Sequence, residues 1–173
     1  MFIPSSVITV GDAEFLIETL AGQLRELLTR RGITDPALVG IHTGGVWIAE
    51  RLRQQLGVLT PLGQMDIAFY RDDFSRIGVH PQVRPSELPF DVDNRHIVLV
   101  DDVLYTGRTI RAALNELFDY GRPASVLLAV LVDRGGREVP IEADAVGTRL
   151  QLPASDQIQL TGPDPLQLRI QVP

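Results

Sequence analysis

Short apolar runs alternate along this chain with longer amphipathic stretches. Residues 37–41, 96–100 and 125–132 are almost wholly apolar, as is usual for strands that are buried on both faces of a sheet. Residues 12–30 and 107–120 carry apolar side chains at helical spacing. Strands that alternate with helices are typical of a mostly parallel sheet with helices on both faces. We therefore expect one α/β domain over residues 1–173, a length that suits a single domain.

Local signals place further elements of this domain. Asp12 is suited to cap the first helix and Gly32 to end it. A second helix is expected over residues 45–56, and the alternating residues 64–70 predict a strand. The tail, residues 143–172, contains shorter strand-like pieces that prolines and a glycine interrupt.

The composition excludes several kinds of chemistry. The chain has no cysteine, which rules out disulfides, thiolate nucleophiles and cysteine zinc sites. It has no lysine either, so all 16 basic residues are arginine, and neither a P-loop nor a Schiff-base enzyme is possible. The three histidines lack metal-ligand spacing. A net charge of −6 disfavours general binding of nucleic acid unless the arginines cluster.

The hydropathy of the chain bears on its location. No run approaches the roughly 20 apolar residues of a membrane span, so we expect no membrane partner. The first 15 residues lack the basic and apolar regions of a signal peptide. We therefore expect a cytoplasmic location.

Three polar, glycine-containing segments directly follow predicted strands. They are residues 42–45, 101–109 and 133–137. The carboxyl ends of parallel strands meet at one edge of a sheet, and ligands of such sheets bind there. We therefore expect the three segments to converge on one site.

Residues 71–95 fit no regular element. The stretch holds Pro81, Pro85 and Pro89 and shows no clear period. A loop of this length in a compact domain is often functional, so we interpret it as a lid and expect residues 72–88 to be mobile without ligand. A plain flexible insertion is the alternative.

The segment 101–109 combines two features that rarely serve the same ligand. A turn that enters a helix presents unpaired backbone N–H groups, and here Gly107 permits close approach while Thr106 and Thr109 add hydroxyl donors. This predicts an anion site, although Thr106 alone could be only a helix cap. Asp101 and Asp102 would repel a phosphate by itself, but they suit a sugar phosphate, whose vicinal hydroxyls donate to carboxylates. Mg²⁺ could share such a site.

The stretch VLVDDVLYTGRT resembles the phosphoribosyl-pyrophosphate (PRPP) binding motif of the type I phosphoribosyltransferases. Further stretches, LVGIHTGGVWIAERL, DIAFYRDDFS and GRPASVLLAVLVDRGGREVPI, resemble the PyrR family, which comprises bifunctional pyrimidine-operon attenuators with uracil phosphoribosyltransferase activity. The resemblance covers roughly residues 7–150. It implies the type I phosphoribosyltransferase fold, with a small hood and a long lid loop added to the central sheet. It also implies a homodimer or a larger homo-oligomer.

The resemblance assigns roles to matching positions. The implied catalytic residues are Asp101, Asp102 and Arg71. The implied PRPP-binding residues are Thr43, Gly44, Gly45, Arg84, Asp101, Asp102, Val103, Leu104, Tyr105, Thr106, Gly107, Arg108 and Thr109. Asp133, Arg134 and Arg137 would border the uracil. Mg²⁺ would be the cofactor, held by Asp101 and Asp102 indirectly through PRPP and water.

The implied reaction converts uracil and PRPP to UMP and pyrophosphate. Uracil N1 attacks the anomeric carbon while pyrophosphate leaves, and Mg²⁺ and arginines stabilise the negative charge on the leaving group. No side-chain nucleophile is needed, which suits a chain without cysteine or lysine.

The chain departs from the family's RNA-binding members at several positions where they are basic. These positions are Gly22, Gly136, Glu142 and Thr148. The arginines that remain for an RNA contact are Arg25, Arg30, Arg31, Arg137 and Arg149. The loop at 43–45 also reads Thr-Gly-Gly where many relatives have Thr-Arg-Gly. We therefore expect weak or absent binding to a pyrimidine-operon leader RNA.

Three functions stay open at this point. The first is a uracil phosphoribosyltransferase, with or without a regulatory activity. The second is a UMP-sensing, RNA-binding attenuation regulator with vestigial catalysis, because a UMP sensor needs the same ribose and phosphate motifs. The third, a purine-specific phosphoribosyltransferase, is disfavoured only by the family resemblance.

Overall fold

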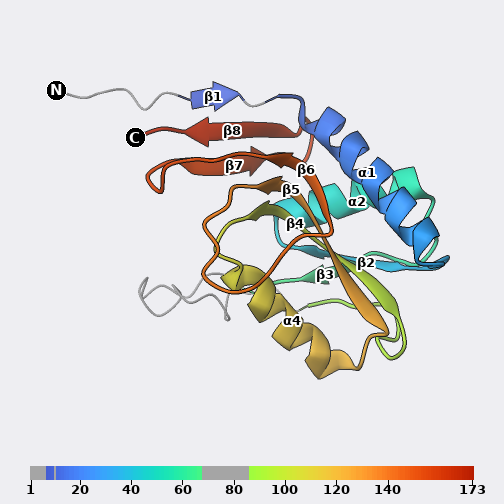
Figure 1. Ribbon diagram of the computed structural model, residues 1–173. Helices are drawn as coiled ribbons and strands as arrows, with labels where there is room; N and C mark the ends of the chain where they lie inside the picture. Colours follow the sequence, from blue (N-terminus) through green and yellow to red (C-terminus); the bar gives the residue numbers. More distant parts are fainter. Residues whose placement is uncertain (1–6, 10, 68–85) are drawn as a thin grey trace.

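The computed structural model describes residues 7–9, 11–67 and 86–173. The helices described are α1 (Ala13–Arg30), α2 (Gly44–Leu56) and α4 (Arg108–Tyr120). The strands described are β1 (Val7–Thr9), β2 (Ala37–Ile41), β3 (Gly63–Met65), β4 (His96–Leu104), β5 (Ser125–Asp133), β6 (Ala145–Arg149), β7 (Gln157–Thr161) and β8 (Gln167–Gln171). Figure 1 shows their arrangement.

The central sheet has five parallel strands in the order β3-β2-β4-β5-β6. In the register, Val39 of β2 lies beside Leu99 of β4, which lies beside Leu128 of β5. All residues of β2 are buried, as are residues 97–100 of β4 and residues 127–132 of β5. The uniform apolar pattern of these strands therefore reflects burial on both faces, and the predicted parallel sheet is confirmed.

Helices cover both faces of this sheet (Figure 1). On one face, Leu20 and Leu24 of α1 and Leu52 of α2 pack in one hydrophobic core with inward residues of β4 and β5. On the other face, Ile110 and Leu117 of α4 belong to a second core. Two cores separated by a sheet are what a three-layer α/β domain requires. No helix in the described ranges is long and apolar enough to cross a membrane.

A second, smaller sheet corresponds to the predicted hood. It contains β1, β8 and β7 in that order, and its strands are antiparallel. Leu160, Leu166 and Leu168 of this region join the core beneath α1 and α2. The hood is therefore anchored to the same face of the central sheet as those two helices.

Two strand boundaries differ from those predicted. β4 does not end before the paired aspartates but continues to Leu104, and Asp101 lies beside Val130 of β5. Pairing with β5 extends the strand beyond its apolar part. The strand predicted over residues 64–70 is wrong in extent, because β3 ends at Met65 and residues 66 and 67 are not in a strand. Residues 68–70 lie outside the described part of the chain.

The predicted lid over residues 71–95 is wrong for its last part. Leu88 and Phe90 pack against the core on the α4 side, and Val92 is buried. The backbone N–H of Glu87 donates to the Gln64 carbonyl, and that of Gln64 donates to the Glu87 carbonyl, both at 2.8 Å. Residues 86–95 are therefore part of the packed domain. Residues 71–85 lie outside the described residues, as does most of the 72–88 range for which we predicted mobility.

Candidate active site

The three predicted site segments come together at the carboxyl edge of the central sheet. Gly44, which follows β2, lies so close to Asp102 of β4 that a β-carbon at Gly44 would be 2.5 Å from Asp102 Oδ2. The N–H of Arg134, which follows β5, donates to the carbonyl of Leu104 at 3.0 Å. The predicted convergence of these segments is therefore confirmed by contacts between neighbouring pairs.

The first segment is the loop from Thr43 to Gly45, where α2 begins. A β-carbon at Gly45 would lie 2.5 Å from the Val100 carbonyl oxygen, so the start of α2 rests directly on β4. The peptide bond between His42 and Thr43 is cis. The first N–H groups of a helix have no partner within the helix and carry its positive end. This loop therefore presents backbone donors at the carboxyl edge of the sheet.

The second segment begins with two carboxylates in different surroundings. Asp101 is 6% exposed, and its Oδ1 accepts the Asp102 N–H at 2.9 Å. Asp102 is partly exposed, and its Oδ1 accepts the Val103 N–H at 2.8 Å. Each carboxylate is thus oriented by the backbone N–H that follows it. Nothing in the sequence distinguishes the two carboxylates, whereas the fold leaves Asp102 more open to a ligand than Asp101.

A tight turn, residues 105–107, joins β4 to α4. Gly107 has a φ of +89°, a conformation that other residues rarely adopt, and a β-carbon there would lie 2.9 Å from Val139 Cγ2. Thr106 Oγ1 accepts the N–H of Arg108, the first residue of α4, at 3.2 Å. The helix cap position is occupied by Gly107, but Thr106 does supply a cap-like hydrogen bond. The turn therefore delivers the amino end of α4 to the same edge as that of α2.

The third segment begins with a buried carboxylate. The Asp133 side chain is 4% exposed, and its Oδ2 accepts from Arg137 Nη2 and Arg149 Nη1, both at 2.7 Å. Its Oδ1 accepts the Gly135 N–H at 3.0 Å. Burial raises the pKa of Asp133, but the hydrogen bonds from Arg137 and Gly135 and the charges of the two arginines outweigh it, so the pKa lies below its ordinary value. Asp133 is therefore held as a carboxylate within a cluster of charges.

Arg134 joins the second segment to the loop that precedes β7. Its guanidinium lies over the Tyr105 ring, 4.1 Å from the ring centroid. The same group donates to the carbonyls of Asp156 at 2.9 Å and Pro153 at 3.0 Å. Gly136 also approaches this ring, since a β-carbon there would lie 2.5 Å from Tyr105 Cε2. Tyr105 is thus fixed in place, and it remains 37% exposed.

The predicted site residues that the structure describes lie in these three segments. Val103 and Leu104 are the last residues of β4, and Arg108 and Thr109 begin α4. Asp133, Arg134 and Arg137 adjoin the second segment, as expected; their contact with uracil stays a prediction. Arg71 and Arg84 lie outside the described residues.

Sequence reasoning missed two partners in this region. Arg149 reaches Asp133 because β6 lies beside β5 with these two residues in register. Glu138 Oε1 accepts from Arg108 Nε at 3.0 Å and so links the third segment to the start of α4. Both pairs join residues 16 or more positions apart, and only the strand register and the path of the 134–144 loop bring them together.

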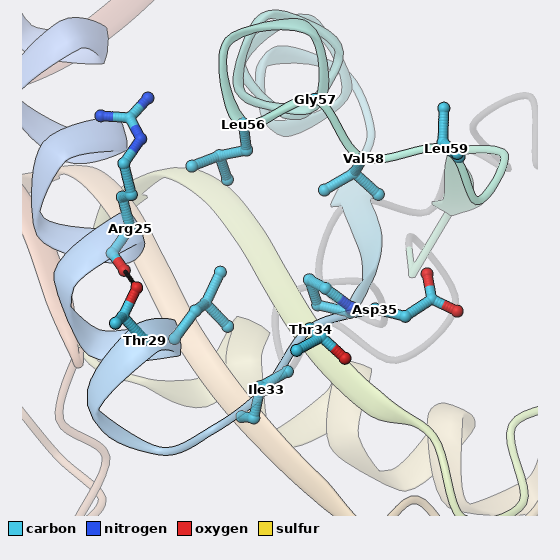
Figure 2. A pocket seen from close by; sticks show the side chains of 11 residues that line it. Arg25, Thr29, Ile33, Thr34, Asp35, Leu56, Gly57, Val58 and Leu59 are labelled. Atoms are coloured by element: carbon cyan, nitrogen blue, oxygen red, sulfur yellow. Dashed lines mark hydrogen bonds between the residues drawn. The ribbon is translucent and has the colours of Figure 1, made fainter.

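Two hollows differ in their relation to this edge. One of about 470 Å³ is lined by residues that include Asp133, Arg137 and Arg149, and so adjoins the third segment. The other, of about 390 Å³, is bounded by the ends of α1 and α2 (Figure 2). Each of these helices leads into the next strand of the parallel sheet, so its carboxyl end lies near the edge where that strand begins. The second hollow therefore lies at the amino edge of the sheet, away from the paired aspartates. We therefore place the candidate site at the carboxyl edge.

Comparison with known proteins identifies the family. A model of the phosphoribosyl transferase domain matches residues 9–166. The bifunctional protein PyrR of Nitrosococcus oceani is 61% identical over 173 residues, which cover 99% of this chain and 97% of that protein. The chain belongs to the PyrR family. PyrR of Pseudomonas putida is 60% identical over 156 residues, 90% of this chain and 91% of that protein.

Solved structures agree with this PyrR assignment at the level of fold. The crystal structure of a hypoxanthine-guanine phosphoribosyltransferase from Bacillus anthracis superimposes with a TM-score of 0.68, covering 86% of each chain at 15% identity. At that identity the likeness concerns the fold alone. The predicted type I phosphoribosyltransferase fold of this chain is thereby confirmed, and the three candidate segments all lie within the matched domain.

Proposed function

We propose that this member of the PyrR family transfers the phosphoribosyl group of PRPP to uracil, giving UMP and pyrophosphate. The observation that carries the proposal is the contact between Gly44 and Asp102. It sets backbone donors suited to a pyrophosphate next to a carboxylate suited to ribose hydroxyls. PRPP carries these two groups on the same ribose ring, so it can span both.

The second anion site of the proposal is the amino end of α4. There residues 105–109 would bind the 5′-phosphate of PRPP through backbone N–H groups and the hydroxyls of Thr106 and Thr109. Asp101 and Asp102, in the part of β4 that contacts the start of α2, would accept hydrogen bonds from the ribose hydroxyls. Arg71 and Arg84 are proposed to meet the pyrophosphate from the segment that is not described. Uracil would lie beside residues 133–137.

The proposed chemistry is a substitution at the anomeric carbon. Uracil N1 forms the new bond as the bond to pyrophosphate breaks, and the N1 proton is released. Positive charge develops on the ribose and negative charge on the leaving pyrophosphate, close to the amino end of α2. The bound Mg²⁺ would neutralise pyrophosphate charge. The partly exposed carboxylate of Asp102 suits it, because Mg²⁺ prefers hard oxygen ligands and keeps several of its waters.

We expect uracil-dependent release of pyrophosphate when the protein is mixed with PRPP and Mg²⁺. A coupled pyrophosphate assay, with hypoxanthine and guanine in parallel reactions, measures it. Reactions without a base control for hydrolysis of PRPP. Release with a purine but not with uracil would contradict the assignment of the base.

A second activity, UMP-dependent binding of leader RNA, is favoured by the relatives, which are named bifunctional. The charges of this chain argue against tight binding. Arg31 pairs with Asp144 just before β6 begins, whereas Arg149 pairs with Asp133 at the other end of β6. Those two arginines therefore lie toward opposite edges of the sheet and do not form one basic patch. The net charge of the chain, −6, also disfavours RNA binding.

We expect weak or absent binding of a pyrimidine-operon leader hairpin at near-physiological salt, because each phosphate contact that is lost lowers the affinity. Titration with and without UMP measures it, and a scrambled hairpin is the control. Tight, UMP-strengthened binding that the scrambled hairpin lacks would instead support the regulator, with catalysis vestigial.

The family resemblance supports two more proposals, a homodimer or larger homo-oligomer and a cytoplasmic location. Sedimentation of the purified protein tests the first.

A further inference from the structure

Residues 137–139 hold the turn at residues 105–107 through its carbonyl groups. Arg137 Nη1 donates to the Tyr105 carbonyl at 3.0 Å. The backbone N–H groups of Glu138 and Val139 donate to the Thr106 carbonyl at 2.9 and 3.3 Å. We call residues 105–107 the phosphate turn and residues 137–139 the support segment. Two successive carbonyls of the phosphate turn are therefore directed at the support segment.

This arrangement determines where the N–H groups of the phosphate turn point. The peptide bonds after Tyr105 and Thr106 are trans. In a planar trans peptide the C=O and N–H groups point in opposite directions. Because the two carbonyls face the support segment, the N–H groups of Thr106 and Gly107 point away from it. The support segment thus sets the direction of two backbone donors at the amino end of α4.

Arg137 is in turn fixed by its own hydrogen bonds. Its Nη2 donates to Asp133 Oδ2 and its Nε donates to the Ile141 carbonyl, both at 2.7 Å. All three nitrogens of the guanidinium therefore have partners in the protein, and the side chain is only 18% exposed. The Asp133 carboxylate is more deeply buried still. A planar guanidinium held at three points has little freedom to move the Tyr105 carbonyl.

We propose that Asp133 and Arg137 are positioning residues that orient the N–H groups of the phosphate turn toward the 5′-phosphate of PRPP. The identity of the ligand, the 5′-phosphate of PRPP, rests on the proposed function. The hydrogen bonds that hold the turn do not depend on it. This role differs from a contact with uracil, because its loss acts first on PRPP. Asp133 works through Arg137, and Arg137 works through the Tyr105 carbonyl.

Arg149 provides a matched control. It donates to the same Asp133 oxygen at the same 2.7 Å, yet its side chain is 64% exposed. Among the described residues, no hydrogen bond joins Arg149 to the phosphate turn. Arg149→Ala and Arg137→Ala therefore remove the same charge from Asp133, but only Arg137→Ala frees the turn.

The test compares steady-state constants for the two substrates. We expect Arg137→Ala to raise KM for PRPP about tenfold or more, the effect of losing a hydrogen bond from a charged group, and KM for uracil less than about threefold. Arg149→Ala should change both constants less than about twofold. A larger rise in KM for uracil than for PRPP, or equal effects of the two variants, would overturn the proposal.

Hydrogen exchange tests the support of the turn without any substrate. The backbone amides of Glu138 and Val139, which donate to the Thr106 carbonyl, should exchange faster in Arg137→Ala and at the wild-type rate in Arg149→Ala. Unchanged exchange in Arg137→Ala would overturn the proposal even if uracil turns over. Absent uracil turnover with faster exchange would instead reject only the proposed function. If Arg137→Ala does not fold, Arg137→Lys, which keeps the charge but loses the three-point fork, is compared in the same way and should also speed exchange.

Discussion

Replacing Asp102 with asparagine should lower kcat/KM for PRPP about 10- to 100-fold while the protein stays folded. A hydrogen bond to a charged group contributes about 1.5–3 kcal/mol, and each 1.36 kcal/mol corresponds to a tenfold change in rate. Asparagine retains an oxygen that can accept the Val103 N–H, so the local backbone contact survives. Asp101→Asn should lower kcat/KM for PRPP in the same way. Because position 101 is buried, the NH₂ group of the new asparagine also needs an acceptor there. Asp101→Asn should therefore be the less stable of the two variants.

Asp119→Asn is the control for these two variants. Asp119 is exposed in the last turn of α4, far along the helix from the paired aspartates. The Asp119→Asn variant should have the same kcat/KM for PRPP as the wild type. Initial rates at limiting PRPP, together with thermal unfolding of each variant, make the comparison. Wild-type rates in Asp101→Asn or Asp102→Asn would show that the carboxylate in question does not hold the ribose.

Gly45→Ala and Gly22→Ala should change stability in opposite directions. A β-carbon at Gly45 meets the Val100 carbonyl oxygen, a backbone atom that cannot rotate away, so the start of α2 must move off β4. Such overpacking costs about 1–3 kcal/mol. Gly22 is exposed in α1 and has no atom within 4 Å of the added carbon. Alanine there should stabilise the protein by about 0.5–1 kcal/mol, through its greater helix propensity.

Denaturant unfolding of the two alanine variants and the wild type measures this contrast. Since Gly45 belongs to the loop proposed to bind pyrophosphate, Gly45→Ala should also slow turnover, whereas Gly22→Ala should not. A Gly45→Ala protein as stable as the wild type would show that the start of α2 can move without cost. The site would then be less rigid than its close packing implies.

The central sheet was predictable because burial on both faces leaves a uniform apolar pattern in β2 and β5. The extent of β4 was not predictable, because its last residues are held by pairing with β5, which no local signal reveals. The packed residues 86–95 were missed for another reason. Leu88, Phe90 and Val92 alternate as buried residues do, but the prolines around them suggested a loop.

The site was predictable at the level of segments rather than of contacts. Parallel strands bring their carboxyl ends to one edge, so Thr43, Asp102 and Asp133 could be placed near one another from the sequence. Which side chains pair there depends on the strand register and on loop paths. The Asp133–Arg149 pair and the support of the phosphate turn by Arg137 are products of that tertiary geometry.

The identity of the nucleotide product tests the central claim most directly. The protein is incubated with PRPP, Mg²⁺ and an equimolar mixture of uracil, hypoxanthine and guanine, and the products are identified by mass spectrometry. Our account predicts UMP as the main nucleotide, formed in step with pyrophosphate. An excess of purine nucleotide, or ribose 5-phosphate without any nucleotide, would contradict it.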